Sequence, residues 1–154
     1  MKKSILFILL IFSGGSVLFS QITEGDDGLY YDAGNKAYAG VYKEFWKNGN
    51  RKLEMPLKRG MKDGETLLYF ENGMKNEVRA YKMGRMHGTW ITWNEAGQKV
   101  AEANYLNGKK NGKWYIWDEN GTMRYDMTYK KGEKKGTWLM WDEEGKLLME
   151  KAYK

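Results

Sequence analysis

The chain of 154 residues carries a net charge of +6, and aromatic residues make up 15% of it beside 19 glycines and a single proline. This length holds about one domain. Because the sequence has no cysteine, disulfides, thiolate metal sites and cysteine nucleophiles are excluded. Basic and acidic residues are interleaved along the sequence, which is typical of a solvated surface, and no nucleic-acid partner is expected.

Residues 1–20 have the pattern of a secretory signal peptide. Lys2 and Lys3 precede the apolar run 5–12, and small residues follow it. The run is shorter than the roughly 20 residues that a spanning helix needs. We expect cleavage after Ser20 and export to the periplasm, the envelope or the exterior, with retention of the leader as an anchor as the alternative.

Residues 21–39 are predicted to form an N-terminal cap hairpin. Two short runs that contain tyrosine, 29–31 and 37–39, flank an Asp-Ala-Gly-Asn turn. The segment resembles the later repeats but does not share their register, as expected of a terminal cap.

From Gly40 onward a unit of 24 residues repeats in constant register. A glycine opens each unit, and another stands nine residues further on. Such a fixed spacing indicates a repeat architecture. The predicted repeats are residues 40–63, 64–87, 88–111, 112–135 and 136–154.

Each unit reads as a β-hairpin. The five residues after the opening glycine, as in 137–141, are rich in aromatic and β-branched types and predict a strand. A polar turn follows and closes on a glycine such as Gly121, for which we expect a positive φ. A second strand and a basic five-residue turn such as 107–111 complete the unit. Pro56 falls inside a second strand, where a bulge or a loss of pairing is predicted.

A lone hairpin is marginally stable in water, so the units must stack. We therefore predict an all-β fold: an elongated repeat protein of stacked antiparallel β-hairpins that form one twisted meander sheet of about ten to twelve strands.

Aromatic residues recur at fixed places in the units and form the candidate binding surface. The last three units each contain a pair of tryptophans, as in Trp114 and Trp117. The two residues of a pair are three positions apart, so a strand without a bulge places one on each face of the sheet. Packing between neighbouring hairpins is the competing interpretation of these residues. The candidate residues are Trp90, Trp93, Trp114, Trp117, Trp138, Trp141, Tyr81, Tyr105 and Tyr129.

The segment Gly84-Arg85-Met86-His87-Gly88-Thr89-Trp90 resembles the MORN repeat, and the 24-residue unit with its Asn-Gly turn is similar to the bacterial MORN variant of YwqK-type proteins. The resemblance covers roughly residues 29–154. It implies a ribbon of stacked hairpins and associates the chain with scaffolding, dimerisation and membrane-linked protein contacts. YwqK-type proteins are commonly labelled antitoxins.

No catalytic, cofactor-binding or metal-binding residues are predicted, and the protein is not expected to be an enzyme. His87 is the single histidine and occupies a turn position that sister units fill with other residues. The acidic pairs Asp118-Glu119 and Glu143-Glu144 lie in predicted turns, where acidic residues are favoured. The glycine-rich turn 108–112 lacks the Ser or Thr of a phosphate-binding loop.

Three functions are compatible with these features. The first is a non-catalytic scaffold of the cell envelope or exterior that binds another protein or its own copy. The second is binding of envelope glycan or lipid headgroups at a membrane surface, through the aromatic residues and the basic turns at 109–110 and 134–135. The third is neutralisation of a partner toxin.

Overall fold

The computed structural model describes residues 21–154, so the signal peptide predicted at 1–20 lies outside the described residues. Residues 21–154 consist of strands joined by turns and contain no helix. The strands are β1 (Thr23–Glu24), β2 (Tyr30–Tyr31), β3 (Gly40–Phe45), β4 (Arg51–Lys58), β5 (Met61–Lys62), β6 (Gly64–Tyr69), β7 (Lys75–Lys82), β8 (Arg85–Trp93), β9 (Lys99–Leu106), β10 (Lys109–Trp117), β11 (Met123–Lys130), β12 (Glu133–Trp141) and β13 (Leu147–Tyr153). The predicted all-β fold is confirmed.

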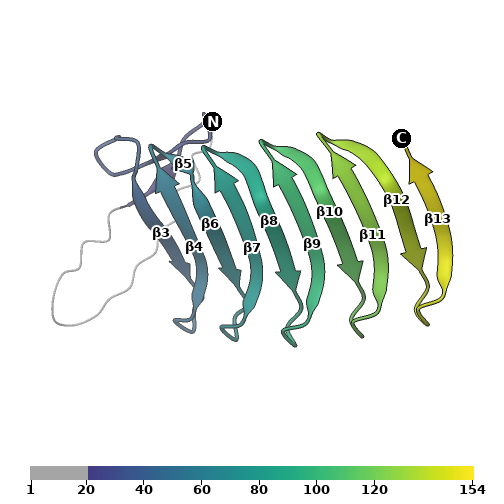
Figure 1. Cartoon of the computed structure of the whole chain (residues 1–154). Coiled ribbons are helices and arrows are strands. Elements are labelled where there is room, and N and C mark those ends of the chain that lie inside the picture. Colours follow the sequence, from purple (N-terminus) through teal and green to yellow (C-terminus); the bar gives the residue numbers. More distant parts are fainter. Residues whose placement is uncertain (1–20) are drawn as a thin grey trace.

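Eleven of the strands form one open antiparallel sheet. Their order is β13-β12-β11-β10-β9-β8-β7-β6-β4-β3, with β5 beside β4. Apart from β6, which lies beside β4 with the short β5 between them in the sequence, neighbours in the sheet are neighbours in the sequence, and the hairpins follow one another in a single row (Figure 1). The predicted meander is confirmed. Because each repeat adds two strands, equivalent residues of successive repeats lie about 10 Å apart.

The turn in the middle of each repeat closes on a glycine with positive φ, as predicted. Between β10 and β11, Gly121 has φ +82° and its N–H donates to the carbonyl of Asp118 at 3.1 Å. The Asp118 carboxylate accepts from the backbone N–H groups of Asn120 at 3.0 Å and Thr122 at 2.9 Å. The side chain of Asp118, the first residue of the turn, thus stabilises the turn through hydrogen bonds to its backbone.

The turn between repeats is shorter than the sequence indicated. Lys109 pairs with Leu106, and Lys110 pairs with Tyr105. The turn between β9 and β10 therefore contains only residues 107–108, and the prediction of a five-residue turn at 107–111 is wrong. The basic residues that follow the turn already belong to the next strand.

Pairing is lost beside Pro56, as predicted. One edge of β4 is intact, since Pro56 pairs with Val41 of β3. On the other edge β4 pairs with β6 only at Leu53 and Glu54, and with the separate strand β5 further along. Later repeats have a register shift at the same place, so the interruption is a property of the unit. In the first repeat it is large enough to divide the partner strand into β5 and β6.

Residues 21–39 form a small sheet of their own at the start of the ribbon. Strand β1 pairs with β2, while the two runs around the turn at 32–35 meet in the single bridge Tyr31–Ala37. The backbone N–H of Tyr30 donates to the carbonyl of Gly60 at 2.9 Å, and the N–H of Gly60 donates to Tyr38 at 2.7 Å. These bonds attach the segment to the turn after β4.

The two faces of the large sheet differ in burial. Trp90 pairs with Ala103 and Gly88 pairs with Tyr105, so Trp90 and Tyr105 point to the same side, which we call the ladder face. Every buried side chain in the described residues lies on this face by register: Met55, Leu57, Thr66, Met127 and Trp138.

Candidate binding surface

Tyrosine and tryptophan rings stack along the ladder face in a continuous row, which we call the aromatic ladder. Neighbouring ring centroids are 4.9–5.3 Å apart, and the rings are tilted or edge-on to one another, which is the favoured geometry of aromatic pairs. Each Trp contacts a Tyr on either side. The ladder consists of Tyr81, Trp90, Tyr105, Trp114, Tyr129, Trp138 and Tyr153.

Hydrogen bonds to the backbone fix the indoles of the aromatic ladder. The Nε1–H of Trp90 donates to the carbonyl of Ala80 at 2.9 Å. The equivalent bonds of Trp114 and Trp138 measure 3.0 and 2.9 Å. Each acceptor lies at the register shift between neighbouring repeats, so the indole replaces a strand-to-strand bond that the shift removes. These tryptophans hold the repeats together.

Lysine side chains lie over the rings of the aromatic ladder in the last two repeats. The Nζ of Lys110 is 4.1 Å from the ring centroid of Trp114 and 4.7 Å from that of Tyr129. Lys134 makes the equivalent contacts with Trp138 at 4.5 Å and with Tyr153 at 5.2 Å. Both lie within the range of cation–π attraction. The neighbouring rings and these ammonium groups occupy much of the aromatic surface of the ladder.

Burial also affects the titration of the phenols in the ladder. Removal from water raises the pKa of Tyr81 and of Tyr105, because the charged phenolate loses hydration. At Tyr81 the nearby Arg79 opposes this increase. Tyr81 and Tyr105 are therefore neutral packing groups at physiological pH.

The second tryptophan of each pair lies on the face opposite the ladder. Thr92, Ile116 and Met140 are on the ladder face by register, so the next residue in each strand, Trp93, Trp117 or Trp141, points the other way. Trp117 contacts Tyr115 at 5.6 Å between centroids, and Lys99 lies 5.7 Å from its ring. The structure thus divides the predicted aromatic set between two faces.

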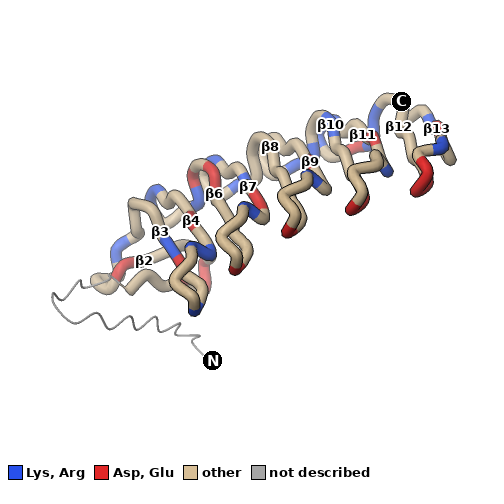
Figure 2. The backbone as a smooth tube through the Cα atoms, turned by 90° about the horizontal axis from the view of Figure 1, so that it is seen from below, with Lys and Arg blue, Asp and Glu red and all other residues tan. Residues whose placement is uncertain are grey.

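Charged residues gather at the two long edges of the ribbon (Figure 2). The turns between repeats and the strand ends beside them, at 58–62, 82–85, 106–110 and 130–135, contain eleven Lys or Arg and one Glu, and we call this side the basic edge. The turns at 70–74, 94–98, 118–122 and 142–146 contain seven Asp or Glu and one Lys, and we call this side the acidic edge. Interleaved in the sequence, the two signs are separated in the fold. Basic residues recur at one place in the 24-residue unit and acidic residues at another, and this regular spacing is the sequence signal that indicates two edges of opposite charge.

The basic edge is most concentrated between β9 and β12. Lys109, Lys130, Lys131 and Lys135 line an open hollow of about 390 Å³ together with Glu133. The four lysines are exposed and form no ion pair with any described carboxylate. The excess of positive charge around the hollow attracts acidic groups of a partner.

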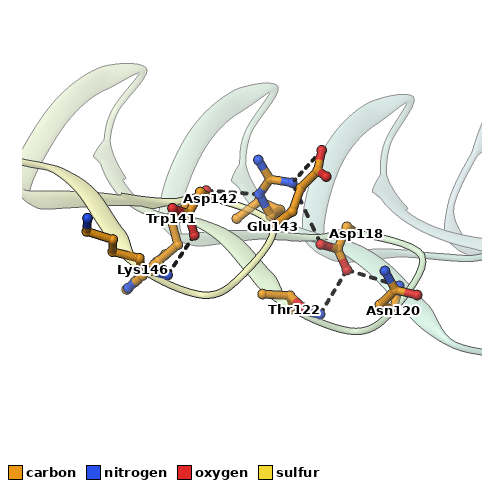
Figure 3. Close-up of polar contacts among 8 residues, drawn as sticks. Asp118, Asn120, Thr122, Trp141, Asp142, Glu143 and Lys146 are labelled. Atoms are coloured by element: carbon orange, nitrogen blue, oxygen red, sulfur yellow. Dashed lines mark hydrogen bonds and ion pairs between the residues drawn. The ribbon is translucent and has the colours of Figure 1, made fainter.

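One residue of each acidic pair that raised the question of catalysis, Asp118 and Glu143, contacts Arg124. Asp118 accepts hydrogen bonds within its own turn and lies 3.7 Å from Arg124, whose Nε–H donates to the carbonyl of Trp141 at 2.9 Å (Figure 3). Glu143 is 4.0 Å from the same guanidinium. Arg124 therefore links two neighbouring acidic turns.

His87 is half-buried in β8, and its Nδ1 has no hydrogen-bond partner. Among residues 21–154 there is no group of three His, Asp or Glu side chains that could hold a metal ion. No helix in this range is long and apolar enough to cross a membrane.

An open ribbon of β-hairpins stacked at a fixed period defines the class of protein: an all-β repeat protein. Residues 86–107, 110–131 and 134–154 match the family model described as the MORN repeat variant, so this part of the chain consists of MORN repeats. The matched segments contain most of the aromatic ladder and three of the five residues that line the hollow of the basic edge, namely Lys130, Lys131 and Lys135. The comparison with curated proteins finds no match. The narrower resemblance to YwqK-type proteins stays a prediction.

Proposed function

We propose that this MORN repeat protein is a non-catalytic binding protein that holds an acidic partner protein along its basic edge. The observation that carries the proposal is the separation of charge in the fold, with four unpaired lysines around one hollow. A surface of this kind recruits acidic partners through long-range attraction and aligns them through several weak contacts. An acidic toxin would be one such partner.

Stacking of envelope glycans on the aromatic residues has less support. Sugar rings need a free aromatic face, whereas Trp114 and Trp138 have a tyrosine on either side and a lysine 4.1 and 4.5 Å from their centroids. Their indole N–H groups already donate to the backbone. The four lysines of the hollow remain available for contacts with a partner.

The proposed site of action is outside the cytoplasm. The support is the sequence pattern of residues 1–20, in which Lys2 and Lys3 precede a short apolar run. Cell fractionation with the full chain, compared with a variant that lacks residues 2–20, tests this part. Recovery of the full chain in the cytoplasm alone would contradict export.

The binding proposal is tested with a fluorescent peptide of about ten glutamates, used as a defined acidic probe at low salt, where surface electrostatics are least screened. The quadruple variant Lys109→Gln/Lys130→Gln/Lys131→Gln/Lys135→Gln removes the lysines of the hollow. Four exposed contacts at about 0.5 kcal/mol each predict a loss of about 2 kcal/mol, or roughly thirtyfold in affinity.

The matched control replaces four exposed lysines outside the basic edge by glutamine: Lys36, Lys47, Lys75 and Lys146. It has the same net charge as the test variant, so it should bind the peptide nearly as well as the wild type does. Equal losses in the two variants would show that only net charge matters and would contradict the proposal. Tighter binding of soluble cell-wall glycan, lost on Trp117→Ala, would favour the aromatic alternative.

A further inference from the structure

We propose that the acidic edge of one copy of this protein binds the basic edge of a second copy, so that copies related by sideways translation join into an open-ended raft. The inference deepens the proposed function, because it gives the basic edge a partner of known chemistry. It rests on the two edges being complementary in charge, in spacing and in direction.

The turns on the two edges alternate along the ribbon. Acidic turns join β6 to β7, β8 to β9, β10 to β11 and β12 to β13, whereas basic turns join β7 to β8, β9 to β10 and β11 to β12. Neighbouring turns on opposite edges are therefore offset by one strand, or about 5 Å. When a second ribbon is moved sideways against the first, each basic turn lies level with the gap between two acidic turns. The repeats on both sides have the same period, so the match extends along the edge.

The distribution of charge selects a parallel arrangement. The acidic edge is strongest at residues 142–146, where three consecutive acidic residues occur, and the basic edge is strongest at 130–135. Both maxima lie at the C-terminal end of the ribbon. At the other end, the turn at 46–50 carries Lys47 and no acidic residue, and it would face the basic turn at 58–62 without attraction. Only a parallel neighbour places the most acidic turn, at 142–146, against the most basic turn, at 130–135.

The groups that would form the contacts are available. Glu143 is 83% exposed, and Glu119 and Glu144 are also exposed. Apart from the 4.0 Å approach of Arg124 to Glu143, none of these three carboxylates has an ion pair within the described residues. Each exposed pair contributes little by itself, so the raft depends on several pairs per contact and on low salt.

The symmetry of the contact determines the form of the assembly. The contact joins two different surfaces of the same chain, so each added copy presents a new free edge. Growth then continues with concentration and has no preferred final size. A closed dimer would require the same surface on both partners.

The test is sedimentation velocity of three proteins at about 20 mM and about 300 mM salt. The first is the wild type. The second is the basic-edge variant Lys130→Glu/Lys131→Glu/Lys135→Glu, and the third is the acidic-edge variant Glu119→Lys/Glu143→Lys/Glu144→Lys. Circular dichroism of the variants checks that they fold, which is expected because all six side chains are exposed.

At low salt the average mass of the wild type should rise with concentration, and high salt should reduce it to the monomer. Each variant alone should remain monomeric because its turns at 130–135 and 142–146, where the charge of the two edges is greatest, then have the same sign. An equimolar mixture of the variants should restore association, because each supplies the edge that the other lacks. A wild type that stays monomeric at low salt, or a mixture that fails to associate, would overturn the raft. The acidic-edge variant retains the native basic edge, so its binding of the glutamate peptide separates a failure of the raft from a failure of the proposed function.

Discussion

The indole Nε1–H of Trp114 donates a hydrogen bond of 3.0 Å to the backbone carbonyl of Asn104, ten residues earlier in the chain. The acceptor lies opposite the register shift that contains Gly112, whose φ of +101° bends β10 away from β9. The tryptophan therefore compensates for a strand-to-strand bond that the bend removes. This explains why a tryptophan stands two residues after the opening glycine in each of the last three repeats.

Replacement of Trp114 by Phe should destabilise the fold by about 2–4 kcal/mol, because the part-buried carbonyl of Asn104 loses its partner and the packing of the ladder is reduced. Trp117→Phe is the matched control, since within residues 21–154 the indole of Trp117 donates no hydrogen bond; its cost should stay below about 1.5 kcal/mol. Urea unfolding measures both. Equal costs would show that the indole hydrogen bond is unimportant.

Thr66 stands where the later repeats have a ladder tryptophan, and its hydroxyl is buried without a hydrogen-bond partner. Thr66→Val should leave stability unchanged or raise it by about 1 kcal/mol, because an unsatisfied buried polar group is removed at nearly constant volume. Thr89→Val should instead cost about 1 kcal/mol, since that hydroxyl donates to Asn104 Oδ1 at 2.8 Å. Thermal unfolding of the two variants provides the comparison, and a lower midpoint for Thr66→Val would contradict the prediction.

Gly121 tests whether the hairpin turns need a positive φ or merely a small residue. A Cβ at this position would meet no atom within 4 Å, so the cost of a substitution is backbone strain alone. Gly121→Val should destabilise by about 1–2 kcal/mol or more, and Gly121→Asn by clearly less, because asparagine adopts the left-handed region more readily. If both variants were as stable as the wild type, the conformation of the turn would not be the constraint.

Tyr42 makes stability depend on pH in the alkaline range. Burial, together with the charge of Glu44 and a hydrogen bond to it, raises the pKa of Tyr42 from 10.0 to about 12. The folded state thus favours the neutral phenol. The resulting stabilisation is complete below pH 10 and is lost as the pH rises towards 12.

Absorbance at the phenolate band and circular dichroism, followed together against pH, measure this effect. We expect the wild type to lose stability across that interval, and the variant Tyr42→Phe to lose less relative to its own stability at neutral pH. Ionisation of all tyrosines in a single step near pH 10 with the fold intact would contradict the prediction.

Much of the fold could be predicted because glycines and aromatic residues recur at the same positions in successive repeats. The regular glycines determine the turns, and the fixed spacing determines that the hairpins stack. The bend at Gly112 could not be foreseen in this way, because the predicted strand begins after this glycine, whereas the observed strand β10 begins at Lys109 and runs through it. For the same reason the turn at 107–108 was predicted to be too long.

The candidate site was only partly predictable. The aromatic residues were identified, but their division between structural and exposed positions depends on hydrogen bonds such as that from Trp114 to Asn104, which connect a side chain to the neighbouring strand. The charged edges do not appear as blocks of charge, because basic and acidic residues are interleaved along the sequence. In a repeat protein, residues 24 apart become neighbours in space, so charge has to be compared at that period.

The most direct test of the proposed basic edge is a titration of the isotopically labelled protein with the glutamate peptide, followed by backbone amide chemical shifts. The account predicts that the largest changes occur at residues 106–111 and 130–135 and that residues 118–122 on the acidic edge do not respond. Changes centred on Trp93, Trp117 and Trp141, with the basic turns unaffected, would contradict it.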